Sequence, residues 1–193
     1  NLDKIHRVIT WAAEGLENVS VSQVELRSHI QFYNGITTKN IHLMLIKSAA
    51  DLISEETPDY QYMAARLAIF HLRKIAYGEF TPPPLLKHVK KMVEMGKYDA
   101  EILQDYTEEE LNQISQLIDL SRDMVYDYAG ANMLVNRYLI KHDGKTYELP
   151  QETFMTISMM LALNEKEGET RVNIVKEFYN ALSLRKLSLA TPI

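Results

Sequence analysis

Residues 57–77 read TPDYQYMAARLAIFHLRKIAY. Pro58 suits the first turn of a helix, where its missing N–H breaks no helical bond, and Asp59 complements the positive end of the helix. From Tyr60 to Tyr77, apolar residues cover nearly the whole helical circumference rather than one stripe. We therefore predict a helix over 60–77 that is buried at the centre of a first helical domain.

Upstream of this helix, apolar spacing predicts three more. The first carries apolar residues at intervals of three and four: Ile5, Val8, Ile9, Ala12 and Leu16. Ser22 followed by Glu25 has the pattern of a capping box, which opens a second helix that reaches about Phe32. Thr37-Thr38 can cap a third helix, whose apolar face extends to Leu52.

Downstream, Gly78 and Pro82-Pro83-Pro84 form the clearest break in the chain, because three prolines cannot continue a helix. The domain boundary is placed here. Beyond it we expect helices over 85–95, 107–118, 124–138, 150–163 and 170–184, and a small hairpin over 141–147. The expected fold class is mainly α: a four-helix domain over 1–80, then a second helical domain over 81–193 with a small β-hairpin.

Composition excludes several classes of protein. The chain has no Cys, which rules out disulfides, zinc ribbons, iron–sulfur clusters and thiol chemistry supplied by these residues. A formal charge of −5 gives no electrostatic basis for binding nucleic acid. No apolar run is long enough to span a membrane, so a cytoplasmic protein is expected. Because the sequence begins with Asn rather than Met, we expect it to be a piece of a longer chain.

Catalytic and metal-binding patterns are also missing. The six histidines form no metal-binding motif, so no metal site is expected. The acidic runs 55–56 and 108–110 stand at predicted helix starts, where acids favour the helix dipole. No nucleophile triad or glycine-rich phosphate loop is present, and no catalytic residue is predicted.

One group of polar residues is more informative. They fall in pairs that share a helix face: Lys4 and Arg7, Thr38 and His42, and His71 and Lys74. If these helices pack together, cations, a hydroxyl and the start of a helix can form a phosphate pocket. The alternative is that basic residues at helix ends simply face water.

The residues resemble a known family. The run from Pro58 to Lys74 is similar to the ATP-cone of class I ribonucleotide reductase large subunits. The resemblance continues in order through the rest of the chain, in the following segments: Met92-Val93-Glu94-Met95-Gly96-Lys97-Tyr98-Asp99, Ser121-Arg122-Asp123-Met124, Tyr128-Ala129, Pro150-Gln151, Phe154-Met155 and Ser188-Leu189-Ala190-Thr191-Pro192-Ile193.

The resemblance implies that 1–80 is an ATP-cone without its N-terminal β-hairpin and that 81–193 is an all-α domain capping the catalytic barrel. ATP or dATP, with Mg²⁺, is then the allosteric effector, and nothing is bound covalently. The implied nucleotide contacts are Asn1, Lys4, Thr38, His42, His71 and Lys74, with Arg7 as a neighbour. Thr191 resembles the threonine that meets the substrate diphosphate.

The resemblance further implies an oxidoreductase that makes deoxyribonucleotides, although its catalytic cysteines and barrel lie outside this chain. The implied partners are the remainder of the large subunit, a small radical-generating subunit and a second large subunit in a homodimer. Two alternatives stay open: a free-standing ATP-cone regulator, and a helical interaction module without reductase activity.

Overall fold

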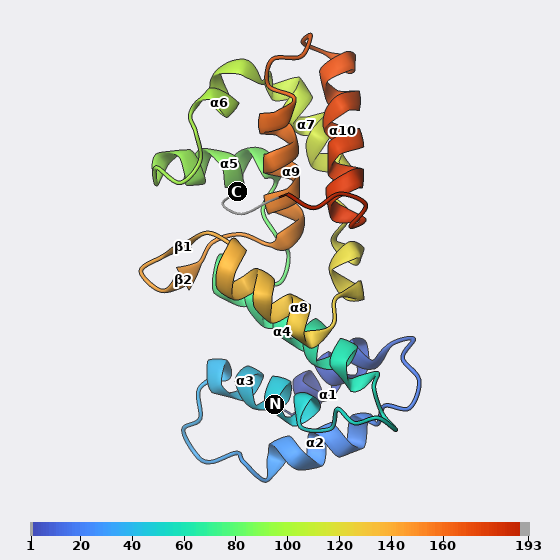
Figure 1. The fold of residues 1–193 in the computed structure, drawn as a ribbon. Coiled ribbons are helices and arrows are strands. Elements are labelled where there is room, and N and C mark those ends of the chain that lie inside the picture. Colours follow the sequence, from blue (N-terminus) through green and yellow to red (C-terminus); the bar gives the residue numbers. More distant parts are fainter. Residues whose placement is uncertain (1, 190–193) are drawn as a thin grey trace. The chain divides into compact units, whose positions relative to one another are not determined.

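The computed structural model describes residues 2–189, which fold into two compact units. The first unit contains the described residues up to Phe80 together with Asp123–Tyr138. The second contains Thr81–Arg122 and the described residues from Leu139 onward. Within the described residues, the regular structure is helical apart from one short hairpin (Figure 1), so the predicted mainly α class is confirmed.

The first unit is built around one long helix. Its helices are α1 (Leu2–Ala13), α2 (Val21–His29), α3 (Thr38–Ala50), α4 (Tyr60–Tyr77) and α8 (Tyr128–Met133). Helix α4 packs against α1, α3 and α8, and Figure 1 shows α8 running beside α4. The fully buried side chains of this core include Ile9, Leu45, Met63 and Leu67.

The prediction of a buried central helix over 60–77 is confirmed. Helix α4 has the predicted bounds and buries residues on several sides of its circumference, among them Tyr60, Ala64 and Leu72. It ends at Gly78, whose left-handed φ of +75° is a conformation that residues with a Cβ atom rarely adopt.

Two predicted helix starts had different outcomes. Thr37 caps α3 as expected, and its hydroxyl accepts a hydrogen bond from the Asn40 N–H at 3.2 Å. The capping box at Ser22 and Glu25 is wrong, because Ser20 caps α2. The Glu25 carboxylate instead lies 2.7 Å from Nδ1 of His6 on α1, which leaves it unable to reach back to the helix start.

The second unit contains the small hairpin and the remaining helices. Its elements are α5 (Leu85–Glu94), α6 (Glu101–Asp105), α7 (Glu108–Leu117), β1 (Lys141–His142), β2 (Lys145–Thr146), α9 (Pro150–Leu161) and α10 (Glu169–Ser183). Strands β1 and β2 are antiparallel, with Lys141 opposite Thr146, which confirms the hairpin. Helix α6 was not predicted, because its single turn is too short to show a periodic pattern.

A buried ion pair fixes the start of α7 against α10. Arg171 donates to both carboxylate oxygens of Glu110, from Nε at 2.9 Å and from Nη2 at 2.6 Å. Both side chains are almost fully buried. Glu110 also completes the predicted capping box with Thr107, so this helix start is confirmed.

A single helix over 124–138 is wrong. The chain forms a 3₁₀ turn over Leu120–Val125, the short helix α8, and then a wider π-helical turn over Leu134–Tyr138. The physical reason is Asp127, whose carboxylate accepts the Gly130 N–H at 2.6 Å and caps a new helix. An N-cap residue has extended rather than helical backbone, so the helix cannot run through it.

Candidate functional site

The predicted site residues that the structure describes lie on three helices of the first unit. Lys4 and Arg7 are on α1, Thr38 and His42 on α3, and His71 and Lys74 on α4. Asn1 and Thr191 lie outside the described residues, so the structure says nothing of their surroundings.

Two of these residues, from different helices, are in direct contact. The imidazole rings of His42 and His71 stack with their centres 5.2 Å apart and their planes 19° apart. His71 is only 7% exposed, and within the described residues neither of its ring nitrogens has a hydrogen-bond partner. A buried polar group without a partner is uncommon in proteins and is a place where a bound group can supply the bond.

Both histidines are predominantly neutral at pH 7. Burial, with His42 and Lys39 nearby, lowers the pKa of His71 to about 4. Burial, together with the charge of Lys74, lowers the pKa of His42 below its ordinary value of 6.5. A neutral imidazole has one donor and one acceptor nitrogen, so the pair can bond to hydroxyl groups as well as to anions.

Aromatic rings continue this cluster. Phe70 stacks on Phe80 with ring centres 4.0 Å apart and planes at 17°, and it also lies 5.0 Å from the Trp11 ring. The centre of the His42 ring lies 6.2 Å from that of Phe70 and 6.3 Å from that of Phe80. Phe70 and Phe80 were not among the predicted site residues. The Phe70 ring lies near both Trp11 on α1 and His42 on α3, but a single phenylalanine on an apolar helix gives no separate signal in the sequence.

Lys74 places a cation beside these rings. Its ammonium lies 4.6 Å from the centre of the Phe80 ring and donates a hydrogen bond to the Gly78 carbonyl at 2.8 Å. The residue is exposed, so the ammonium is also open to solvent. Lys74 therefore combines a full charge with a position next to flat apolar surfaces.

Thr38 stands at the N-terminus of α3, where the free backbone N–H groups of the first turn favour an anion. Thr38 is exposed, and it lies one turn before His42 on the same face of α3. The start of α3 can therefore contribute both a hydroxyl and backbone donors next to the histidine stack.

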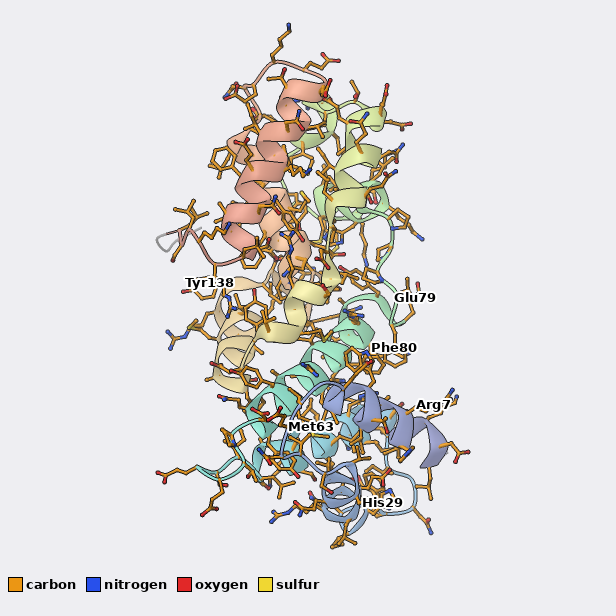
Figure 2. All side chains as sticks on the ribbon, turned by 90° about the vertical axis from the view of Figure 1, so that its right-hand side faces the viewer. Arg7, His29, Met63, Glu79, Phe80 and Tyr138 are labelled. Atoms are coloured by element: carbon orange, nitrogen blue, oxygen red, sulfur yellow. The ribbon has the colours of Figure 1, made fainter. Side chains whose placement is uncertain are left out.

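Among the described residues, the structure shows no bond from Lys4 or Arg7 to His42 or His71. Both are exposed on α1, and among the described residues neither forms an ion pair. Figure 2 shows the Arg7 side chain extending from α1. Arg7 and Trp11 help to line an open hollow on that helix. These cations remain available to an anion but do not by themselves complete a pocket.

The arrangement suits a ligand with a flat ring and negative charge. The Phe70 ring, on which Phe80 stacks, offers a flat surface, Lys74 offers a charge, and the histidines offer neutral donors and acceptors. Among the residues that the structure describes, no group of His, Cys, Asp or Glu could hold a metal ion. No described helix is long and apolar enough to cross a membrane.

Two protein families match the chain. Residues 1–75 match the ATP cone domain, and residues 124–193 match the all-alpha domain of ribonucleotide reductase.

Curated relatives are similar over the whole chain. The chain is 59% identical over 195 residues to ribonucleoside-diphosphate reductase 1 subunit alpha of Escherichia coli (strain K12), which covers 100% of this chain and 26% of that protein. The subunit alpha of Haemophilus influenzae is 58% identical, with the same coverage. That of Enterobacteria phage T4 is 45% identical over 98% of this chain and 25% of its own length. The chain thus spans about a quarter of the length of these relatives.

Proposed function

The chain belongs to the family of ribonucleoside-diphosphate reductase alpha subunits, and we propose that its first unit binds ATP or dATP, with Mg²⁺, as an allosteric effector. The observation that carries this proposal is the cluster of His42, His71 and Lys74 from two helices, set beside the stacked rings of Phe70 and Phe80. It offers charge, hydrogen-bonding groups and a stacking surface to one ligand.

The proposed roles follow from the chemistry of each side chain. Lys74 binds phosphate oxygens through its ammonium, and Lys4 and Arg7 add charge from α1. Thr38 contributes its hydroxyl and the N–H groups at the start of α3. His42 and His71, being neutral, bond to the ribose hydroxyls or to phosphate oxygens. Asn1 is proposed as a further contact from the family resemblance alone.

The chain as a whole is proposed to be the N-terminal regulatory part of an enzyme that reduces ribonucleoside diphosphates. On this proposal, the second unit packs against the catalytic barrel, which lies in the remainder of the subunit, and Thr191 meets the substrate diphosphate. The full subunit forms a homodimer and works with a small radical-generating subunit in the cytoplasm.

Regulation requires a difference in binding energy between two states. ATP and dATP differ by one ribose hydroxyl, so each must favour a different state of the assembled enzyme by binding that state more tightly. A donor or acceptor that meets this hydroxyl is the simplest source of such a difference. The unpartnered nitrogens of His71 are candidates for this contact.

Calorimetric titration of ATP and dATP tests the proposal. The titration uses this chain and a version extended upstream. We expect binding, weakened about tenfold or more by Lys74→Ala, because a charge-assisted hydrogen bond is lost. Thr38→Ala should weaken binding less.

Lys47→Ala is the matched control, since Lys47 is an exposed lysine in the last turn of α3, away from the histidines. Binding that is insensitive to Lys74→Ala would place the nucleotide elsewhere. No binding by either form of the protein would reject the proposed regulatory role and leave the family membership unchanged.

A further inference from the structure

The three residues that follow α4 are held by side chains of the candidate site. The Lys74 ammonium donates to the Gly78 carbonyl at 2.8 Å and lies over the Phe80 ring at 4.6 Å. Phe80 also stacks on Phe70, with the two ring centres 4.0 Å apart. Figure 2 shows Glu79 and Phe80 just beyond the end of α4. The segment 78–80 is therefore attached to two of the groups that a nucleotide would use.

The same segment leads directly into the connection between the two units. Phe80 is the last residue of the first unit before the chain enters the second at Thr81, and Pro82-Pro83-Pro84 then lead to α5. Consecutive prolines have fixed φ angles and form an extended, semi-rigid spacer. The segment 78–80 therefore lies immediately before this spacer in the chain.

An anionic ligand and the segment compete for Lys74. A charge-assisted bond between an ammonium and a phosphate is stronger than a bond from the same ammonium to a neutral carbonyl. A phosphate that binds Lys74 also offsets its charge, which weakens the attraction between the ammonium and the Phe80 ring. Both contacts that Lys74 makes with the segment weaken when such a ligand arrives.

The segment also covers a face of Phe70 on which the flat ring of a ligand can stack. One face of Phe70 is covered by Phe80, with nearly parallel planes at 17°. The His42 ring lies 6.3 Å from Phe80 and 6.2 Å from Phe70, so the same aromatic group borders the histidine stack. A nucleobase that stacks on this face of Phe70 must displace the Phe80 ring.

We propose that residues 78–80 are a latch: they occupy the nucleotide site through Lys74 and Phe70, and a bound nucleotide releases them together with the start of the proline connection. The inference rests on the proposed function, because it needs a nucleotide at this site. It adds a route by which binding in the first unit reaches the chain segment that enters the second.

The first test is the nucleotide affinity of a Phe80→Ala variant, measured by calorimetry with ATP. Removing the ring removes the competitor, so we expect ATP to bind about threefold to tenfold more tightly than to the unaltered chain. Phe178→Ala is the control of matched residue type, on α10 of the second unit, and should leave the affinity unchanged. Equal or weaker binding by Phe80→Ala would overturn the latch, since Phe80 would then be neutral or part of the binding surface.

The second test is hydrogen–deuterium exchange of peptides covering residues 75–88, with and without saturating ATP. Release predicts faster exchange of the Gly78 amide, which donates to the Lys74 carbonyl at 3.0 Å, when ATP is bound. Unchanged or slower exchange, in a sample whose titration shows binding, would overturn the latch and leave the proposed function standing. No heat of binding from either the unaltered chain or Phe80→Ala would overturn both.

Discussion

Replacing Glu110 by Gln should cost the second unit about 3 kcal/mol of stability. Burial alone would raise the pKa of Glu110, but hydrogen bonds from Arg171, Gly168 and Thr107 hold it at about 2, against an ordinary value of 4.5. At about 1.4 kcal/mol per pKa unit, the difference corresponds to about 3 kcal/mol in favour of the charged form. Breaking a buried pair by removing one partner typically costs about 3–5 kcal/mol, which agrees.

The variant leaves the Arg171 guanidinium charged in a site where its side chain is 5% exposed. Its remaining bonds are to the Asp105 carbonyl at 2.6 Å and, more weakly, to the Leu163 carbonyl at 3.5 Å. Neither carbonyl carries the opposite charge, so they do not replace the carboxylate.

Urea denaturation followed by far-ultraviolet circular dichroism measures this loss. Glu109→Gln is the matched control, because Glu109 is the exposed neighbour, and it should change stability by less than about 0.5 kcal/mol. A loss below about 1 kcal/mol for Glu110→Gln would show that the pair contributes little more than its desolvation removes, and would refute the reasoning.

Further predictions concern pH, a helix cap and a turn. The folded pKa of Glu110 lies below its unfolded value, so its contribution is complete above about pH 4.5 and is lost toward pH 2; Glu110→Gln should flatten the urea midpoint over this window. Burial, with Lys91 nearby, lowers the pKa of His88 to about 4, so stability should fall between pH 6.5 and 4, and nuclear magnetic resonance of the ring should show it still neutral at pH 6. Thr107→Ala should cost about 1 kcal/mol in urea denaturation, with Thr107→Ser close to the unaltered chain, and equal losses would reject the cap. Gly78→Ala should cost about 1 kcal/mol from its φ of +75°, and an unchanged melting temperature would contradict this.

Local patterns were the part of the fold that could be predicted from the sequence. The capping box at Thr107, the cap at Thr37 and the apolar helix over 60–77 all depend on residues within a few positions of one another. The mistakes came from competition among local signals. Ser20 and Ser22 are both good caps, and only the packing of α2, with Glu25 engaged by His6, selects between them.

Features that depend on contacts between residues far apart in the sequence could not be predicted from local patterns. Residues 123–138 belong to the first unit because α8 packs on α4. This contact joins residues that are far apart in the sequence, so helical spacing does not predict it. In the candidate site, helical spacing correctly put His71 and Lys74 on one turn of α4, but it gave no reason to select Phe80. That ring reaches the site only because the chain turns back at Gly78.

The contact between Trp11 and Phe70 gives the protein an intrinsic optical probe. Trp11 is the only tryptophan in the chain, and its ring lies 5.0 Å from Phe70, which in turn touches Phe80 and borders His42. Indole emission depends on neighbouring charges and on quenching by groups such as protonated imidazole. Excitation at the red edge of the absorption band therefore reports on the surroundings of one ring in the first unit. Rearrangement of the aromatic cluster can then be followed on the millisecond scale by stopped flow, without attaching a dye.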